Sequence, residues 1–265
     1  MASPPSKPPH PFRIANFRAY WAARLAMTLA QNGMIIVIGW QTYAIAKPLY
    51  GQSGAAAQLG LVGLLQFLPL FLTTPVTGWV ADRFDRRWIV RFTVTLQLAC
   101  ALALAVATYA GAMSLPVIFS VAVLLGLARA FAGPAFGALA PNLVPREVLP
   151  TAIALSSTSW QMGAIVGPAI GGWAYSLAPS AAYWVASGLF GTALIAVFLI
   201  GPVPRTHDVG KAHPLRQIVN GMAYVWQNKL VLGSITLDLF AVFLAGTNAV
   251  LPIYAADVLL SLIHI

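Results

Sequence analysis

Long apolar segments separated by short polar ones dominate the chain from residue 17 onward. A helix needs about 20 apolar residues to cross the hydrocarbon core of a bilayer, which is about 30 Å thick. Seven segments meet this requirement, with expected boundaries at 17–46, 57–81, 88–110, 115–139, 152–177, 181–200 and 231–257. The pattern therefore predicts an all-α membrane protein.

The polar segments divide the chain into parts. Residues 1–16 are a proline-rich tail without a cleavable signal sequence, and residues 17–200 hold six spans that we expect to form one transmembrane bundle. A polar connector, residues 201–230, leads to a further span at 231–259. Within the connector, apolar residues at helical spacing predict an amphipathic helix on the membrane surface: Leu215, Ile218, Val219, Met222, Val225 and Trp226.

The amount and placement of charge agree with a lipid environment. Charged residues make up 8% of the chain, whereas soluble domains contain about 25%. The net charge of +9 does not indicate a nucleic-acid partner, because the cations lie in alternate loops. The positive-inside rule places the N-terminus in the cytoplasm, and we expect the membrane to be a bacterial plasma membrane. The outer loops then hold Lys47, and the inner segments hold Lys7, Arg13, Arg18, Arg83, Arg86, Arg87, Arg91, Arg146, Arg205, Lys211, Arg216 and Lys229.

A dense charged cluster lies between the second and third spans, in the loop from Gly78 to Arg87. Gly78 lacks a Cβ and would let a neighbouring helix approach. Asp82 would interact with a helix N-terminus or pair with an arginine. The arginines are expected to form ion pairs that latch one conformation, or alternatively to anchor the loop at the lipid headgroups; they are Arg83, Arg86 and Arg87.

A glycine motif marks the fifth span. Gly163, Gly167 and Gly171 are four residues apart, so they share one helix face and permit close helix packing. Pro168 removes a backbone donor and can bend the helix, and Gly172 completes the motif. Ordinary tight packing is the alternative to a role in transport.

Three charged residues lie within expected spans. A charge at membrane depth is costly and usually faces a cavity or a partner, which applies to Arg129 and Arg24. Arg129 could instead extend to the inner surface. Asp238 is the only carboxylate well inside a span, and a low dielectric favours its neutral form, so it is the candidate for proton coupling; pairing with a basic neighbour is the alternative.

Other polar or amphipathic side chains on the spans could line a cavity for a small molecule. Each one alone is also explained by an interhelical hydrogen bond. These residues are Gln31, Asn32, Gln66, Trp160, Gln161 and Asn248. No catalytic group, metal site or cofactor is expected, because the histidines lie in tails or loops. The single Cys100 lies within a span and excludes a disulfide within the chain.

The chain resembles the major facilitator superfamily of secondary transporters in three places: the charged loop, the glycine motif, and the fourth-span segment around Arg129 and Gly133. The fourth-span segment differs from the superfamily's motif at Ala132, where the superfamily commonly has glutamine. The glycine motif is similar to that of the superfamily's antiporters. Two short segments, residues 16–21 and 237–240, resemble its enterobactin-exporter-like branch.

The resemblance implies two six-helix bundles, each built from 3+3 inverted repeats, that transport by alternating access. This chain would hold the N-terminal bundle, the linker and the first helix of the second bundle, and the missing C-terminal half would be its partner. Residues 260–265 resemble the translation of a sequencing adapter, so we expect a non-native tail on a truncated gene. A genuine seven-span protein is the alternative.

The expected function is therefore secondary active transport, as a proton-coupled exporter of a siderophore, drug or similar amphiphilic small molecule. Import of a small metabolite is the alternative. An intramembrane enzyme is disfavoured because no acid pair or His-Glu-x-x-His motif lies in the spans. A seven-helix sensor would leave the Gly78–Arg87 loop unexplained.

Overall fold

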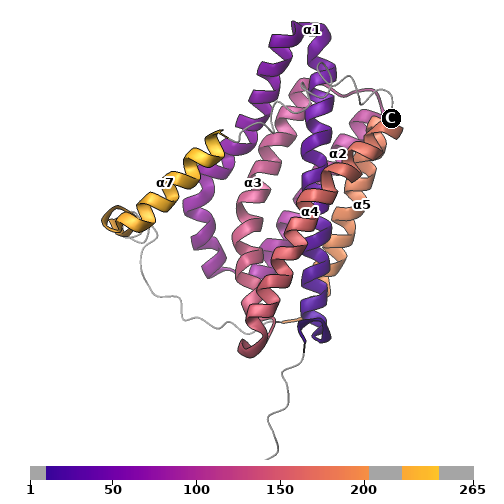
Figure 1. The fold of residues 1–265 in the computed structure, drawn as a ribbon. Coiled ribbons are helices and arrows are strands. Elements are labelled where there is room, and N and C mark those ends of the chain that lie inside the picture. The colour runs from indigo at the N-terminus through magenta and orange to yellow at the C-terminus, as the bar shows by residue number, and fades with distance from the viewer. Residues whose placement is uncertain (1–9, 203–222, 245–265) are drawn as a thin grey trace, which may run out of the picture.

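The computed structural model describes residues 10–202 and 223–244, and within these ranges the chain is helical without strands. The long helices are α1 (Ala15–Arg83), α2 (Arg86–Tyr109), α3 (Leu115–Leu139), α4 (Leu149–Leu177), α5 (Pro179–Phe198) and α7 (Lys229–Leu244) (Figure 1). Short 3₁₀ turns occur at Pro11–Arg13, Ala140–Asn142 and Arg146–Val148. Residues 1–9, 203–222 and 245–265 lie outside the described ranges. Three features expected from the sequence fall there: most of the amphipathic connector, Asn248 and the non-native tail.

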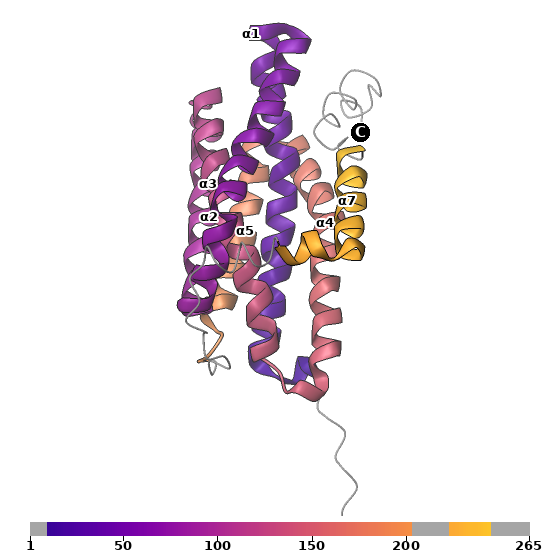
Figure 2. The ribbon, with the colours of Figure 1, turned by 90° about the vertical axis from the view of Figure 1, so that its left-hand side faces the viewer.

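α1 consists of two arms that turn back on each other at Gly51 (Figure 1). Gly51 has φ 68° and ψ −175°, a conformation that is essentially restricted to glycine. The turn projects beyond the ends of the other helices (Figure 2). The two arms correspond to the first and second expected spans, 17–46 and 57–81.

The remaining helices of the bundle follow the expected spans closely. α2, α3, α4 and α5 begin and end within three residues of the boundaries expected from the sequence. α4 begins earlier than expected, and Pro150 occupies its first turn, where the missing N–H of proline has no cost. α7 covers the described part of the seventh expected span.

By length and hydropathy, four helical stretches of the described residues can cross a membrane: Ala15–Thr74, Arg86–Tyr109, Leu115–Asn142 and Pro179–Phe198. α4 is long enough but carries several hydroxyl side chains in its first half. These bond back to their own helix, as Ser156 Oγ does to the carbonyl of Ala152 at 2.9 Å. Their polarity is thereby satisfied within α4.

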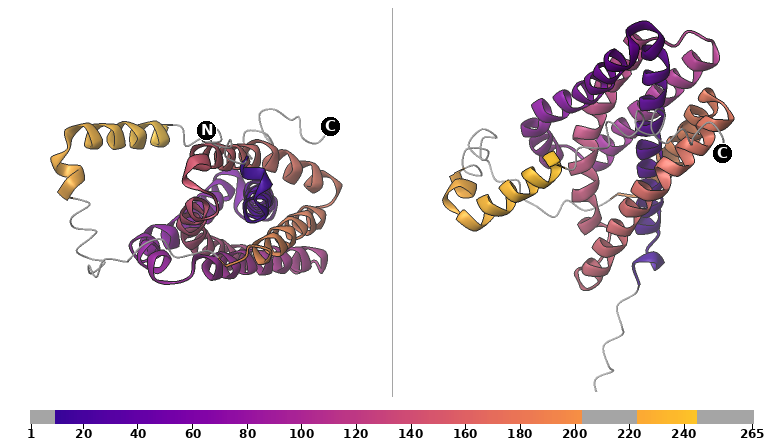
Figure 3. Two further views of the ribbon diagram at one scale, coloured as in Figure 1. Left: turned by 90° about the horizontal axis from the view of Figure 1, so that it is seen from below. Right: turned by 45° about the horizontal axis from the view of Figure 1, so that its top comes forward.

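The core lies where the first arm of α1 packs between other helices. α1 packs against α4, α3 and α5, and α2 packs against α5 and α3; the arrangement is seen along the helices in Figure 3 (left). The largest fully buried side chains include Tyr20, Phe17, Tyr183 and Phe190. Because lipid is as apolar as this core, its stability comes from close packing and interhelical hydrogen bonds.

The outside of the bundle is also apolar. Large side chains such as Phe92, Val106 and Ile195 are 70%, 55% and 66% exposed. A soluble protein rarely exposes so many large apolar groups together. α7 stands apart from the bundle (Figures 1 and 3), and Leu230 and Leu237 on it are exposed.

Candidate functional site

The glycine motif of α4 lies directly against the first arm of α1. Gly163, Gly167 and Gly171 are buried on the same face. A Cβ added at Gly167 would lie 2.7 Å from the carbonyl oxygen of Leu29, and one added at Gly171 would lie 2.7 Å from that of Gly33. Such distances are shorter than real Cβ atoms allow. The two helices therefore meet backbone to backbone.

Gly33 supplies the other side of this contact. A Cβ at Gly33 would lie 3.0 Å from the carbonyl oxygen of Gly167. We call Gly33 together with Gly163, Gly167 and Gly171 the glycine seam. Sequence reasoning missed Gly33 because a lone glycine has no spacing pattern.

The other two residues of the predicted motif lie outside the glycine seam. A Cβ at Gly172 would meet nothing within 4 Å. Pro168 is half-buried, and α4 continues through it.

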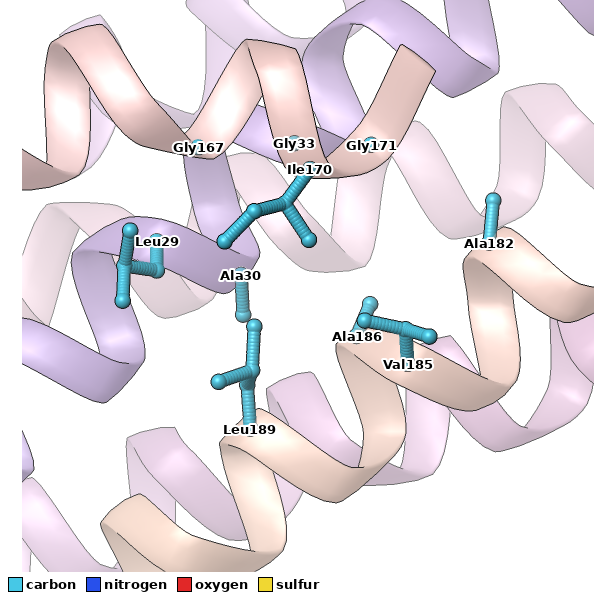
Figure 4. A pocket seen from close by; sticks show the side chains of 10 residues that line it. All are labelled: Leu29, Ala30, Gly33, Gly167, Ile170, Gly171, Ala182, Val185, Ala186 and Leu189. Atoms are coloured by element: carbon cyan, nitrogen blue, oxygen red, sulfur yellow. The ribbon is translucent and has the colours of Figure 1, made fainter. Parts of the chain in front are cut away.

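A small apolar pocket adjoins the glycine seam between α1, α4 and α5 (Figure 4). Its volume is about 10 Å³, which is at most enough for one water molecule. Its lining is entirely apolar and consists of Leu29, Ala30, Gly33, Gly167, Ile170, Gly171, Ala182, Val185, Ala186 and Leu189. The pocket is therefore a packing gap and not a substrate site.

A polar cluster joins the two arms of α1 to α3 and α2. Arg129 Nη1 donates to Gln66 Oε1 at 3.0 Å, and Arg129 Nη2 donates to the carbonyl oxygen of Gln31 at 3.3 Å. The Gln31 side chain donates to Gln97 Oε1, and Gln97 Nε2 donates to the carbonyl of Thr93 at 3.2 Å. These bonds hold the Arg129 guanidinium between helices and not at the end of α3.

Gln97 is fully buried, and sequence reasoning missed it. The available signal was a single amide in the otherwise apolar middle of the third expected span. A buried amide needs a hydrogen-bond partner, and Gln31 is the partner that the fold provides.

Arg24 lies nearer the N-terminal end of the first arm and has a different partner. Its Nη1 donates to Tyr20 Oη at 2.7 Å, and Tyr20 Oη donates to the carbonyl oxygen of Phe136 at 3.2 Å. Tyr20 is fully buried. Arg24 is therefore connected to α3 through a tyrosine and does not contact Arg129 by any hydrogen bond among the described residues.

The Gly78–Arg87 loop makes bonds within the bundle. Arg86 Nη1 donates to the carbonyl oxygen of Ala138 at 2.9 Å, and Asn142 Nδ2 donates to the same oxygen at 3.0 Å. Ala138 lies in the last turn of α3, where carbonyl groups lack helical partners and attract a cation. Arg86 thus ties the start of α2 to the end of α3.

Asp85 organises the start of α2, a role that sequence reasoning did not assign to it. Its Oδ1 accepts a hydrogen bond from the backbone N–H of Arg87 at 3.0 Å, which caps the helix. Its Oδ2 forms an ion pair with Arg87 Nη2 at 2.7 Å. The signal was present in the sequence, because aspartate is among the preferred residues just before a helix.

Two other predicted residues of this loop, Gly78 and Arg83, are exposed. Gly78 is exposed, and a Cβ there would meet nothing within 4 Å, so the expected close helix approach is absent from the described part of the chain. Arg83 is exposed at the end of α1. The side chain of Asp82 lies outside the description.

The remaining candidates do not converge on one cavity within the described residues. Asn32 donates to the carbonyl of Thr28 at 2.8 Å, one turn earlier in its own helix. Trp160 and Gln161 are exposed on α4, and Asp238 is exposed on α7. No group of three or more His, Cys, Asp or Glu residues in 10–202 and 223–244 could hold a metal ion.

Comparison with known proteins gives a consistent result. The family model described as Major Facilitator Superfamily matches residues 29–261. The chain is 32% identical over 256 residues to macrolide efflux protein A of Streptococcus pyogenes. This alignment covers 91% of this chain and 59% of that protein. It is also 32% identical over 219 residues to macrolide efflux protein A of Enterococcus faecalis, covering 77% of this chain and 64% of that protein.

The chain also matches an uncharacterized MFS-type transporter of Mycobacterium bovis over a shorter stretch, with 34% identity over 122 residues. This alignment covers 44% of this chain and 27% of that protein. The chain thus spans less than two thirds of the length of these relatives.

Proposed function

Because this chain belongs to the major facilitator superfamily, a family of multi-pass membrane proteins, we propose that it is part of a secondary active transporter that exports an amphiphilic small molecule in exchange for protons. Two of its relatives are named for macrolide efflux, which supports export as the direction. A siderophore or a drug has the amphiphilic character that the largely apolar helices suit. The resemblance to the enterobactin-exporter-like branch stays a prediction.

The glycine seam is the observation that carries this proposal. Where helices interlock through side chains, a relative shift requires those side chains to change rotamer. At Gly33, Gly167 and Gly171 the contact is made by backbone atoms, so a shift of α1 along α4 needs no change of rotamer at these positions. The shift would have to break the bonds that Trp21 Nε1 and Thr28 Oγ1 donate to the carbonyl oxygens of Leu155 and Ser159, at 2.9 and 3.3 Å. Small sliding motions of packed helices are a common form of conformational change, and alternating access needs one.

We assign the cytoplasmic face to the end of the bundle that holds the Gly78–Arg87 loop. Arg13, Arg18, Arg83 and Arg146 are exposed there or near the same helix ends, as the positive-inside rule requires of a plasma-membrane protein with a cytoplasmic N-terminus. Arg86 and Arg87 hold the loop in place through Ala138 and Asp85. In the proposed transporter Arg83, exposed on this fixed loop, acts as a latch residue, and Asp82 interacts with a helix N-terminus or an arginine.

Asp238 is the proposed site of proton coupling, because it is the only carboxylate well inside an expected span and a low dielectric favours its protonated form. Export then requires that proton binding at Asp238 and substrate binding favour opposite conformations.

The test is transport by the full-length protein in inside-out vesicles under an imposed pH gradient, with a labelled macrolide and a labelled catecholate siderophore as substrates. We expect gradient-driven uptake of at least one of the two substrates into these vesicles by wild type, its loss in Asp238→Asn, and its retention in Glu147→Gln. Glu147 is an exposed carboxylate between α3 and α4, so this control removes the same charge outside the spans.

Two results would contradict the proposal at different levels. Flux that does not depend on the gradient would remove proton exchange. Gradient-driven flux that is unchanged in Asp238→Asn would remove only the assignment of Asp238.

A further inference from the structure

Arg129 lies deep within the bundle. It is ten residues before the end of α3, which places it about 15 Å from that end at about 1.5 Å per residue. Half of the hydrocarbon thickness is also about 15 Å. Arg129 therefore lies near the middle of its span, far from the lipid headgroups, where a charge is costly unless it faces a cavity or a partner.

The hydrogen bonds of Arg129 leave its charge uncompensated. A guanidinium has five N–H donors, and its two bonds go to neutral acceptors, the Gln66 side chain and the Gln31 carbonyl. Its Nε is buried and has no hydrogen-bond partner. Among the side chains described in 10–202 and 223–244, no carboxylate forms an ion pair with Arg129.

The sequence explains this absence within the first bundle. Between residues 10 and 202 the carboxylates are Asp82, Asp85 and Glu147, and all three lie in or beside the loops that join helices. The bundle interior therefore holds two arginines and no acidic residue along its spans. An interior of this kind attracts an anion and repels a cation.

The neighbours of Arg129 are held in fixed positions. Gly126 lies one turn before Arg129 on α3, and a Cβ there would collide with the backbone of Gln66, coming within 3.0 Å of its Cα. The second arm of α1 is thus pressed against α3 where Gln66 meets the arginine. On the other side, the fully buried Gln97 holds the side chain of Gln31.

We propose that Arg129, positioned by Gln66 and Gln31, binds the carboxylate or similar planar anionic group of the transported molecule. Arginine's planar fork of donors matches the two oxygens of a carboxylate. Part of the Arg129 residue remains exposed, and the ligand group would approach the guanidinium from that side. The inference rests on the proposed transport function and narrows its substrate to amphiphiles that carry an acidic group.

Arg24 provides a matched control. It lies in the same bundle and carries the same charge, but its guanidinium bonds to Tyr20. Replacement of either arginine by glutamine changes the net charge equally. Only a local site at Arg129 makes the two variants differ.

The experiment uses the full-length protein in lipid nanodiscs and three probes of similar size: 1-naphthoate, 1-naphthylmethanol and 1-naphthylmethylamine. Binding is measured by equilibrium dialysis with empty nanodiscs subtracted. We expect saturable binding of naphthoate at least tenfold tighter than that of the other two. We expect Arg129→Gln to abolish this preference and Arg24→Gln to retain it.

Arg129→Lys keeps the charge but loses the fork, so it should bind naphthoate a few fold more weakly than wild type while still preferring it. Folding of each variant is checked by the reactivity of Cys100, which is buried in the folded protein and reacts with a thiol dye when the protein unfolds. If Arg129→Gln does not fold, the test uses Arg129→Lys instead. Equal binding of the three probes, or equal loss in Arg24→Gln and Arg129→Gln, would overturn the anion site. The vesicle assay separates the two proposals. Gradient-driven export in vesicles without an anion preference in the binding experiment would refute only the anion site. An anion preference without export would refute the transport function.

Discussion

At the scale of single residues, the loop between α1 and α2 works through side chains that bond within their own bundle. Asp85 caps α2 and pairs with Arg87, while Arg86 binds the last turn of α3. The side chains of Arg87 and Asp85 are 17% and 29% exposed. An ion pair with this exposure contributes about 0.2–1 kcal/mol, so the cap is expected to be the larger of the two contributions of Asp85.

Two substitutions of Asp85 separate its contributions. Asp85→Asn retains a capping oxygen and should lower stability by at most about 1 kcal/mol. Asp85→Ala removes the cap as well and should cost about 1 kcal/mol more. The measurement is the thermal midpoint at which buried Cys100 becomes reactive to a thiol dye, with Glu147→Ala as the control. Equal midpoints for the two variants would mean that Asp85 does not cap α2.

The buried amide pair offers a second prediction. Gln97→Leu keeps the volume of the side chain but leaves the Gln31 amide without its acceptor. Side-chain hydrogen bonds inside membrane proteins are worth about 0.6 kcal/mol on average and up to about 1.7, so a modest fall in the same thermal midpoint is expected. Gln161→Leu, on the exposed face of α4, should leave the midpoint unchanged. A Gln97→Leu protein as stable as wild type would show that the pair contributes nothing.

At the scale of elements, the contact between α1 and α4 depends on the absence of side chains. The sequence predicted that Gly163, Gly167 and Gly171 share one face, because their spacing determines this before any partner is known. It could not predict Gly33 or the choice of α1 as the partner, since these depend on how the helices are arranged in space. The same limit explains why Gln97 was missed.

The prediction for this contact uses two glycines of α4. Gly167→Val would place its Cβ 2.7 Å from the Leu29 carbonyl, and overpacking of this kind typically costs about 1–3 kcal/mol. The Cβ added by Gly172→Val meets nothing within 4 Å, and this substitution carries the same loss of a glycine in a helix. Thermal unfolding in detergent should show a lower midpoint for Gly167→Val only. Equal effects of the two substitutions would mean that the helices are not in close contact.

At the scale of the whole molecule, the all-α membrane fold and the superfamily expected from the sequence are confirmed. Long apolar segments predict helices well because the bilayer fixes their length. The candidate site was harder to predict. Arg129 and Gln66 were identified separately as polar residues on apolar spans, but only the packing of α3 on the second arm of α1 brings them together.

Membrane orientation is the prediction that belongs to the whole molecule. In a Cys100→Ala background, a cysteine at Ala110, exposed at the end of α2, should react with an impermeant thiol reagent added outside intact cells. A cysteine at Phe84, 58% exposed in the opposite loop, should react only after the membrane is permeabilised, because the positive-inside rule places its arginine neighbours inside. Labelling of the Phe84 position in intact cells would reverse the orientation and remove the proposed latch.

The reversal of α1 at Gly51 has a consequence for biosynthesis. Its two arms lie antiparallel, so they can be inserted into the bilayer as a hairpin, in which only the connecting turn has to pass to the far side. Lys47 is the one formal charge near that turn, whereas the arginines of α1 lie further along the arms, from Arg18 and Arg24 to Arg83. The insertion machinery would therefore translocate a single cation while it threads both helices, which keeps the energetic barrier to this step low.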